Sequence, residues 1–130
     1  MKINTSTTSV ILLVGGSGSR FSSLNEKPKQ LSKLNNDYIL MHIIKNLNKH
    51  GLNHFILPLG YKINFFKKFF NSKKNIKKYK FNLLSKNFKN INLKKNRINI
   101  SLFDAGKNTN KMKRVIKSLK YIIDNDLLIV

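Results

Sequence analysis

The sequence predicts an α/β protein with a mainly parallel sheet. Short apolar runs rich in β-branched residues alternate along the chain with stretches whose apolar residues recur at helical spacing. The first run is apolar at every position from Val10 to Val14, as a strand buried on both faces of a parallel sheet requires. Hydrophobic residues make up 41% of the 130 positions, which is enough for the core of one domain or part of one.

The first strand is predicted at residues 9–14 and stops at a pair of glycines. A long polar connection with three glycines and one proline follows over residues 15–36. A helix comes next, because apolar residues recur at helical spacing over residues 39–47. Asn36 or Asp37 can cap its start, and Gly51 closes its end.

The second strand is predicted at residues 54–59, although Pro58 cannot donate a hydrogen bond to a neighbouring strand. A short amphipathic helix follows at residues 63–70, and its phenylalanines are expected in the core. No single period fits residues 71–97, which hold nine lysines. Residues 99–103 alternate between polar and apolar side chains like a third strand.

A last helix is predicted over residues 111–123, followed by another buried strand at 127–130. The apolar face of that helix is formed by Met112, Val115, Ile116, Leu119, Tyr121, Ile122 and Ile123. Because the sequence stops inside a fully apolar strand, we expect a truncated domain.

The composition is strongly basic, with 26 Lys+Arg against 5 Asp+Glu and a formal net charge of +21. Such a chain attracts polyanions, including nucleic acid. However, 23 of the cations are lysine and only 3 are arginine, and Asn (19) and Ile (15) are also abundant. All are residues of A/T-rich codons, so compositional drift accounts for much of the excess and nucleic acid is not the expected partner.

The remaining composition excludes several classes of protein. The chain has no cysteine, which excludes disulfides, thiolate zinc sites and cysteine nucleophiles. No apolar run approaches the roughly 20 residues of a membrane-spanning helix, and the short polar N-terminus does not resemble a signal peptide. We therefore expect a cytoplasmic protein that does not bind a membrane.

The one strong chemical motif follows the first strand directly, and it reads Gly15-Gly16-Ser17-Gly18-Ser19-Arg20. Glycines allow backbone N–H groups to approach a ligand closely, and consecutive N–H groups form an anion-binding nest. Arg20 adds a fixed cation that suits phosphate. The motif is not a Walker loop, and Phe21 stands where a dinucleotide-binding fingerprint needs its third glycine.

A second basic cluster, Lys27-Pro28-Lys29, lies in the same connection. Pro28 restrains the backbone between the two lysines, so their side chains are held in a defined relation. The glycine nest, Arg20 and the proline-anchored lysines together form a cationic cradle of the size of a triphosphate.

These residues resemble the signature of the sugar-1-phosphate nucleotidylyltransferases, which have a glycine loop ending in arginine followed by Lys-Pro-Lys. Within that superfamily the chain is most similar to the glucose-1-phosphate cytidylyltransferase family. The further matching motifs are Ile39-Leu40-Met41-His42-Ile43, Gly60-Tyr61-Lys62, Asp104-Ala105-Gly106 and Lys113-Arg114-Val115. The resemblance spans residues 9–130 and is loosest over 71–97.

The resemblance implies a three-layer, nucleotide-diphospho-sugar transferase-like fold, α/β/α, of which residues 1–130 form the N-terminal, nucleotide-binding part. It also implies transfer of a nucleotidyl group from a nucleoside triphosphate, CTP, to glucose 1-phosphate. It implies that Leu13, Val14, Gly15, Gly16 and Ser17 wrap the base and ribose. Gly18, Ser19 and Arg20 would then hold the triphosphate, with Arg20 stabilising the pyrophosphate that leaves. Lys29 would bind near the α-phosphorus, and Arg20 and Lys29 are the two catalytic candidates.

Several positions depart from the family pattern. Gln30-Leu31 follows the Lys-Pro-Lys cluster where the family has Pro-Met, and Val14 replaces alanine. Lys111 stands in the place of a substrate-binding arginine, which keeps the charge but loses the bidentate fork. The family also implies Mg²⁺, but its carboxylate ligands and the sugar-binding half lie beyond residue 130, so no metal ligand is predicted here. A homo-oligomer is compatible with the resemblance.

One alternative function is also open. Residues 73–95 could instead make the chain a basic module that binds RNA or DNA through its lysines. Asp104 is expected to cap a loop, and His42, His50 and His54 have no ligand spacing with one another.

Overall fold

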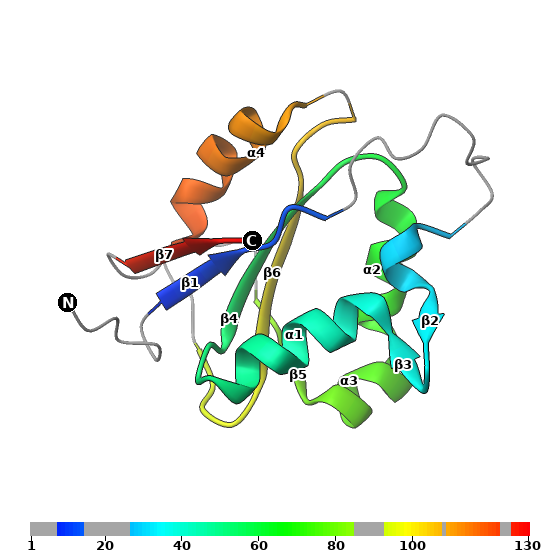
Figure 1. Cartoon of the computed structure of the whole chain (residues 1–130). Coiled ribbons are helices and arrows are strands. Elements are labelled where there is room, and N and C mark those ends of the chain that lie inside the picture. Colours follow the sequence, from blue (N-terminus) through cyan, green and yellow to red (C-terminus); the bar gives the residue numbers. More distant parts are fainter. Residues whose placement is uncertain (1–7, 15–26, 85–92, 108, 123–125) are drawn as a thin grey trace.

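The computed structural model describes residues 8–14, 27–84, 93–107, 109–122 and 126–130. A five-stranded sheet forms its centre, in the order β5-β6-β4-β1-β7, and every pairing in it is parallel (Figure 1). The strands are β1 (Thr8–Ile11), β4 (His54–Leu59), β5 (Phe81–Leu83), β6 (Ile98–Asp104) and β7 (Asp126–Ile129). The predicted α/β class with a mainly parallel sheet is confirmed.

Helices cover both faces of this sheet (Figure 1). On one face lie α1 (Ile39–Lys49), α2 (Ile63–Asn71) and α3 (Lys73–Tyr79). On the other lies α4 (Lys111–Ser118), which continues into a 3-10 turn, η4 (Leu119–Tyr121). Successive strand residues point to opposite faces, so Val10 joins the core beneath α1 and α2 while Ile11 joins the smaller core beneath α4. The three-layer prediction is therefore confirmed.

Aromatic side chains fill much of the larger core. Phe66, Phe69 and Phe70 of α2 are buried, as the amphipathic pattern predicted. Phe69 meets Phe70 edge-on, with ring centroids 5.1 Å apart, and lies 6.0 Å from Phe81 of β5. Such edge-on pairs add to the hydrophobic gain of burying the rings.

The central strand β4 contains a proline, and the neighbouring strand accommodates it. In the parallel ladder Leu12 N donates to Ile56 O at 2.9 Å, so residue 58 would be next to donate, to Leu12 O. Pro58 has no N–H, and Leu12 O instead accepts from Val14 N at 2.9 Å. The last ladder bond between β1 and β4 is therefore the one from Leu12 N to Ile56 O.

Three local elements differ from the predictions. The N-cap residue of α1 is Tyr38, and no side chain caps the helix. The capping roles predicted for Asn36 and Asp37 are therefore wrong. The connection before it contains a 3-10 turn, η2 (Lys29–Leu31), and a short hairpin of β2 (Lys33–Leu34) and β3 (Asp37–Tyr38). The segment without a period contains α3 and β5.

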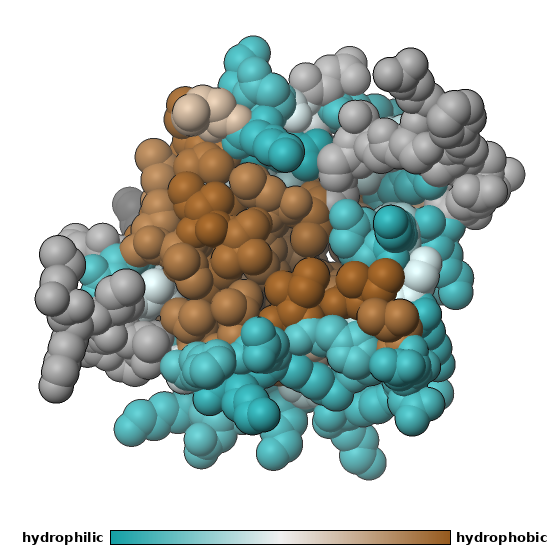
Figure 2. Space-filling model, viewed as in Figure 1, coloured by the Kyte–Doolittle hydropathy of each residue, from teal (hydrophilic) through white to brown (hydrophobic). Residues whose placement is uncertain are grey.

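Only part of the predicted apolar face of α4 and η4 faces the sheet. Tyr121 is buried in the smaller core, and Val115 and Ile122 pack against it. Met112, Ile116 and Leu119 are 67%, 57% and 48% exposed, whereas Arg114 and Ser118 are buried. The last strand, β7, was predicted as buried but is an edge strand, and Ile129 is 49% exposed. Figure 2 shows the resulting apolar surface, which extends over α4 and β7. Both elements are therefore less covered than their sequences predicted.

Candidate functional site

The candidate site lies at the carboxyl edge of the sheet, where ligands bind in open α/β folds. Because β1, β4 and β6 are parallel, all three end at this edge. Four of the predicted site residues are described, namely Leu13, Val14, Lys29 and Lys111. The others lie outside the described residues: Gly15, Gly16, Ser17, Gly18, Ser19 and Arg20.

Leu13 and Val14 lie just beyond β1 and are held by main-chain hydrogen bonds. Leu13 N donates to Val130 O at 3.0 Å, which ties this segment to the end of β7. The Val14 side chain is 7% exposed and packs in the larger core. The chain therefore enters the glycine motif from a fixed position between β4 and β7.

A buried arginine holds the end of this segment from the opposite face of the sheet. Arg114 of α4 is 4% exposed, and its Nη1 donates to Val14 O at 3.4 Å. Its Nε donates to Thr109 O at 3.2 Å. Both acceptors are neutral carbonyls, so a positive charge lies buried beside the residue that precedes the glycine motif. The sequence placed Arg114 in a family motif but gave it no role, because nothing local links it to Val14.

The loop between β6 and α4 approaches this arginine and is tightly packed. Asp104 Oδ1 accepts from Gly106 N at 2.8 Å, which confirms the predicted loop-capping role. Lys117 Nζ donates to Ala105 O at 2.9 Å, and the Thr109 hydroxyl donates to the same carbonyl. A Cβ on Gly60 would lie 2.3 Å from Gly106 O, so only glycine permits this approach.

Lys111 is exposed in the first turn of α4, directly after this loop. The helix is capped by Asn110, whose Oδ1 accepts from Lys113 N at 2.8 Å. The cap and the buried Arg114 one turn later fix the start of α4, so Lys111 emerges from a defined backbone position.

Lys29 begins the 3-10 turn η2. Pro28 before it is buried, as is Leu31 after it, whereas the side chains of Lys27 and Lys29 are exposed. The turn is joined to the following helix because Ile39 N donates to Ser32 O at 2.9 Å. Pro28 therefore presents two cations from an anchored backbone, as the sequence predicted.

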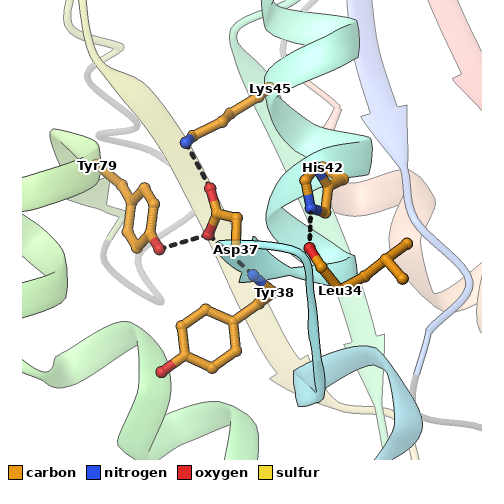
Figure 3. Close-up of polar contacts among 6 residues, drawn as sticks. All are labelled: Leu34, Asp37, Tyr38, His42, Lys45 and Tyr79. Atoms are coloured by element: carbon orange, nitrogen blue, oxygen red, sulfur yellow. Dashed lines mark hydrogen bonds and ion pairs between the residues drawn. The ribbon is translucent and has the colours of Figure 1, made fainter.

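A buried carboxylate fastens the hairpin after Lys29 to two helices (Figure 3). Asp37 accepts from Lys45 Nζ of α1 at 2.5 Å, from the Tyr79 hydroxyl of α3 at 2.7 Å and from Tyr38 N at 2.9 Å. Burial alone would raise the pKa of Asp37, but these three hydrogen bonds hold it down at about 2. Burial and the bond to Asp37 raise the pKa of Tyr79.

A cavity of about 340 Å³ opens beside Lys27. Its lining consists of Lys27, Leu31, Tyr38, Phe65, Lys68, Phe69, Ser72 and Asn75. The cations Lys27 and Lys68 therefore line the same cavity as three aromatic rings, those of Tyr38, Phe65 and Phe69. This combination suits an anionic ligand with a flat ring.

The donor atoms for a metal are not gathered in the part of the chain that the structure covers. No three His, Cys, Asp or Glu side chains come together among its residues. No helix in that part is both long and apolar enough to cross a membrane.

The parallel sheet with helices on both faces is consistent with the nucleotide-diphospho-sugar transferase-like fold. Over 61 residues, or 46% of its length, the chain is 43% identical to a Bacillus subtilis (strain 168) protein named probable glucose-1-phosphate cytidylyltransferase. The match lies in the N-terminal part of the chain and covers 24% of the relative's length. No protein-family profile matches the chain.

Proposed function

We propose that the chain forms the nucleotide-binding part of a nucleotidylyltransferase that joins CTP and glucose 1-phosphate to give CDP-glucose and pyrophosphate. The observation that carries this proposal is the 43% identity over 61 residues to a protein of that name. The parallel sheet supports it, because the glycine motif follows β1 at the edge where such folds bind ligands.

In the proposed reaction a phosphate oxygen of glucose 1-phosphate attacks the α-phosphorus of CTP. A new P–O bond forms, the bond from the α-phosphorus to the bridging oxygen breaks, and pyrophosphate leaves with that electron pair. Such transfers depend on positioning and on neutralising charge rather than on a protein nucleophile. The protein's task is therefore to align two anions and to stabilise the leaving group.

Each predicted residue has a part in that task. Residues 13–17 contact the base and ribose, and residues 18–20 hold the triphosphate, with Arg20 on the leaving pyrophosphate. Lys29 binds near the α-phosphorus, which its exposed position on an anchored turn supports. Arg114 binds the carbonyl of Val14, just before the glycine motif, and adds a positive charge that is partly shielded from water.

The resemblance also implies Mg²⁺, and the described residues do not fit it. Asp104 is the carboxylate at the end of β6, and its Oδ1 already accepts from Gly106 N. No second or third metal-binding side chain joins it within the described ranges. We therefore assign no step of the reaction to a metal.

Nucleotide binding is tested by calorimetry with CTP, UTP, ATP and GTP on the full chain. We expect CTP to bind most tightly, and Arg20→Ala and Lys29→Ala each to weaken it by about 10- to 100-fold, the value of one charge-assisted hydrogen bond. Lys33→Ala is the matched control, because Lys33 is also exposed and lies four residues further along. Failure to bind any of the four, or an equal loss in the control, contradicts the proposal.

The sugar phosphate is tested at Lys111. Lys111→Ala should weaken glucose 1-phosphate binding without changing the affinity for CTP, and Lys111→Arg should strengthen it, because arginine restores a bidentate contact. Lys113→Ala removes an equal charge from an exposed position two residues away. If the two alanine variants behave alike, Lys111 has no particular role.

A further inference from the structure

A second basic feature lies at the opposite edge of the sheet. A cavity of about 730 Å³ separates α3 from the turn at residues 93–97, which leads into β6. We call it the cationic groove, and its lining is Lys73, Ile76, Lys77, Lys80, Lys95, Asn96 and Arg97. A neighbouring cavity of about 570 Å³ shares Lys80, Asn96 and Arg97, so the two cavities have one wall in common. Because β5 and β6 begin here, the groove is separate from the candidate site at their carboxyl ends.

The walls of the groove are held by a buried amide. Asn99 is fully buried, and its Nδ2 donates to the carbonyls of Asn53, Lys94 and Arg97 at 2.9, 3.1 and 3.3 Å. Its Oδ1 accepts from Lys94 N at 2.9 Å. On the other wall, Lys80 O accepts from Ile98 N at 3.0 Å. The turn that carries Lys95 and Arg97 is thus fixed to the end of α3.

The described residues around the groove supply no negative charge to balance its cations. Five of its seven lining residues are cations, and neither cavity has a carboxylate in its lining. Among the described carboxylates, Asp37 is bonded to Lys45 and Tyr79, and Asp104 lies at the other end of β6. Asp126 is on β7, the opposite edge strand. Compositional drift explains the number of lysines, but not their convergence on one concave surface.

The spacing of these cations indicates the shape of the ligand. Lys73 and Lys77 lie one turn apart on α3, and Lys80 follows at its end, so the three cations form a row about 10 Å long. A nucleic-acid strand carries one phosphate per about 3.4 Å of helix rise, but the strand is inclined to the helix axis. Successive phosphates are therefore further apart than this rise, and the row spans about two of them. The aromatic ring in the second cavity, Tyr79, is only 5% exposed and offers no surface for a base. A phosphodiester backbone therefore fits the groove better than a single phosphate or a stacked base.

From these observations we infer that the cationic groove binds the phosphodiester backbone of a nucleic acid without reading its bases. The composition alone favoured drift over nucleic acid, and the fixed, uncompensated groove reverses that preference. Hydrophilic residues cover the lower side of the molecule in Figure 2, where α3 and the 93–97 turn lie in Figure 1. This inference is independent of the proposed nucleotidyl transfer.

The test compares two triple variants of the full chain that lose the same charge. Lys77→Gln, Lys95→Gln and Arg97→Gln remove cations from both walls of the groove. Lys67→Gln, Lys74→Gln and Lys113→Gln remove three exposed cations that do not line it, one of them on α3 itself. Fluorescence anisotropy with short labelled single strands of RNA and of DNA, over a range of salt concentrations, measures the affinity.

We expect the groove variant to bind about 100-fold more weakly than the unmodified chain at about 0.1 M salt, and the control variant only slightly more weakly. The slope of log K against log salt should fall by about 2 in the groove variant, because three phosphate contacts of about 0.7 each are lost. Equal affinity for several base sequences is expected. Similar losses for RNA and DNA identify the shared backbone as the ligand, whereas a loss for one polymer alone identifies that polymer.

Three results would overturn the inference. The first is an equal loss of affinity in the two variants, since net charge rather than position would then control binding. The second is competition by polyglutamate as effective as that by RNA, which would point to an acidic protein. The third is the absence of binding by the unmodified chain at low salt. CTP affinity, measured on the same variants, should not change, so failure here is distinguishable from failure of the proposed transfer.

Discussion

Arg114 donates a hydrogen bond to the carbonyl oxygen of Val14 at 3.4 Å, although the two residues are 100 positions apart in the chain. The bond joins α4 to the point where β1 leads into the glycine motif. Because Arg114 is 4% exposed and also donates to Thr109 O, its guanidinium is part of the interior as much as of the site. We therefore expect stability and ligand binding to be coupled at this residue.

Replacing Arg114 by methionine should affect both properties. Two buried carbonyls lose their donor, so we expect the free energy of unfolding to fall by about 1–3 kcal/mol. CTP affinity should fall as well, because the glycine motif loses both its anchor and a nearby positive charge. Urea denaturation measures the first effect and calorimetry the second.

Leu52→Ala is the control for Arg114→Met. Leu52 is buried just before β4, at the edge of the sheet away from the site, and its truncation should cost about 2–5 kcal/mol. If this variant loses CTP affinity to the same degree, the effect of Arg114→Met reflects general destabilisation and no specific support of the site.

Gly60→Ala should distort the candidate site through the backbone. A Cβ at this position would lie 2.3 Å from Gly106 O and 2.9 Å from Gly106 C, and neither atom belongs to a side chain that can rotate away. We expect a loss of about 1–3 kcal/mol in unfolding free energy, as for other overpacked sites. Amide chemical shifts measured by NMR should change over residues 104–110. An unchanged melting temperature would contradict the close approach.

Much of the fold was predictable because its central strands are short, rich in apolar residues and clearly bounded by polar segments. Residues 54–59 were predicted as a strand, and β4 has these same bounds. All six of its residues are buried, as an apolar run in a central strand requires. The segment at 71–97 was not assigned, because α3 buries only Tyr79 and so shows no apolar period. Its helix is instead begun by Ser72, whose Oγ accepts from Asn75 N.

The orientation of α4 could not be predicted from its pattern. An apolar stripe identifies an amphipathic helix, but the side that faces the sheet also depends on hydrogen bonds to distant groups. Arg114 reaches Val14 O, and the Ser118 hydroxyl donates to Arg114 O at 2.7 Å, so both polar residues are satisfied when buried. Sequence therefore singled out Lys29 and Lys111, whose side chains are exposed, but not Arg114, whose contact lies across the fold.

Asp37 should stabilise the protein only above a defined pH. Its pKa is about 2 in the folded protein against 3.8 for an ordinary aspartate, so the unfolded chain binds the proton more tightly. The contribution, about 2 kcal/mol, is complete above about pH 4 and is lost as the pH falls towards 2. Asp37→Asn should remove this dependence and lower stability at neutral pH. Asp126→Asn, on the exposed edge strand, should retain it when unfolding is followed by circular dichroism.

His54 should cause a separate loss of stability on acidification, at a higher pH than the loss caused by Asp37. Its Nδ1 lies 3.0 Å from Ser9 Oγ and its Nε2 2.9 Å from Ser101 Oγ, and the ring is 1% exposed. A neutral imidazole donates from one nitrogen and accepts at the other, so one serine donates to the ring and the other accepts from it. Burial lowers the pKa of His54 to about 4 from 6.5, so the folded protein keeps the ring neutral.

The unfolded chain therefore binds a proton that the folded protein does not, and stability falls as the pH drops from about 6.5 to about 4. The loss approaches 3 kcal/mol at the lower limit. His54→Gln should be less stable at neutral pH and should lose this dependence, whereas His50→Gln, at an exposed position, should keep it. Should the His54 variant not fold, NMR of the unmodified protein decides the point, because titration of the His54 ring near pH 6.5 would rule out a buried neutral histidine.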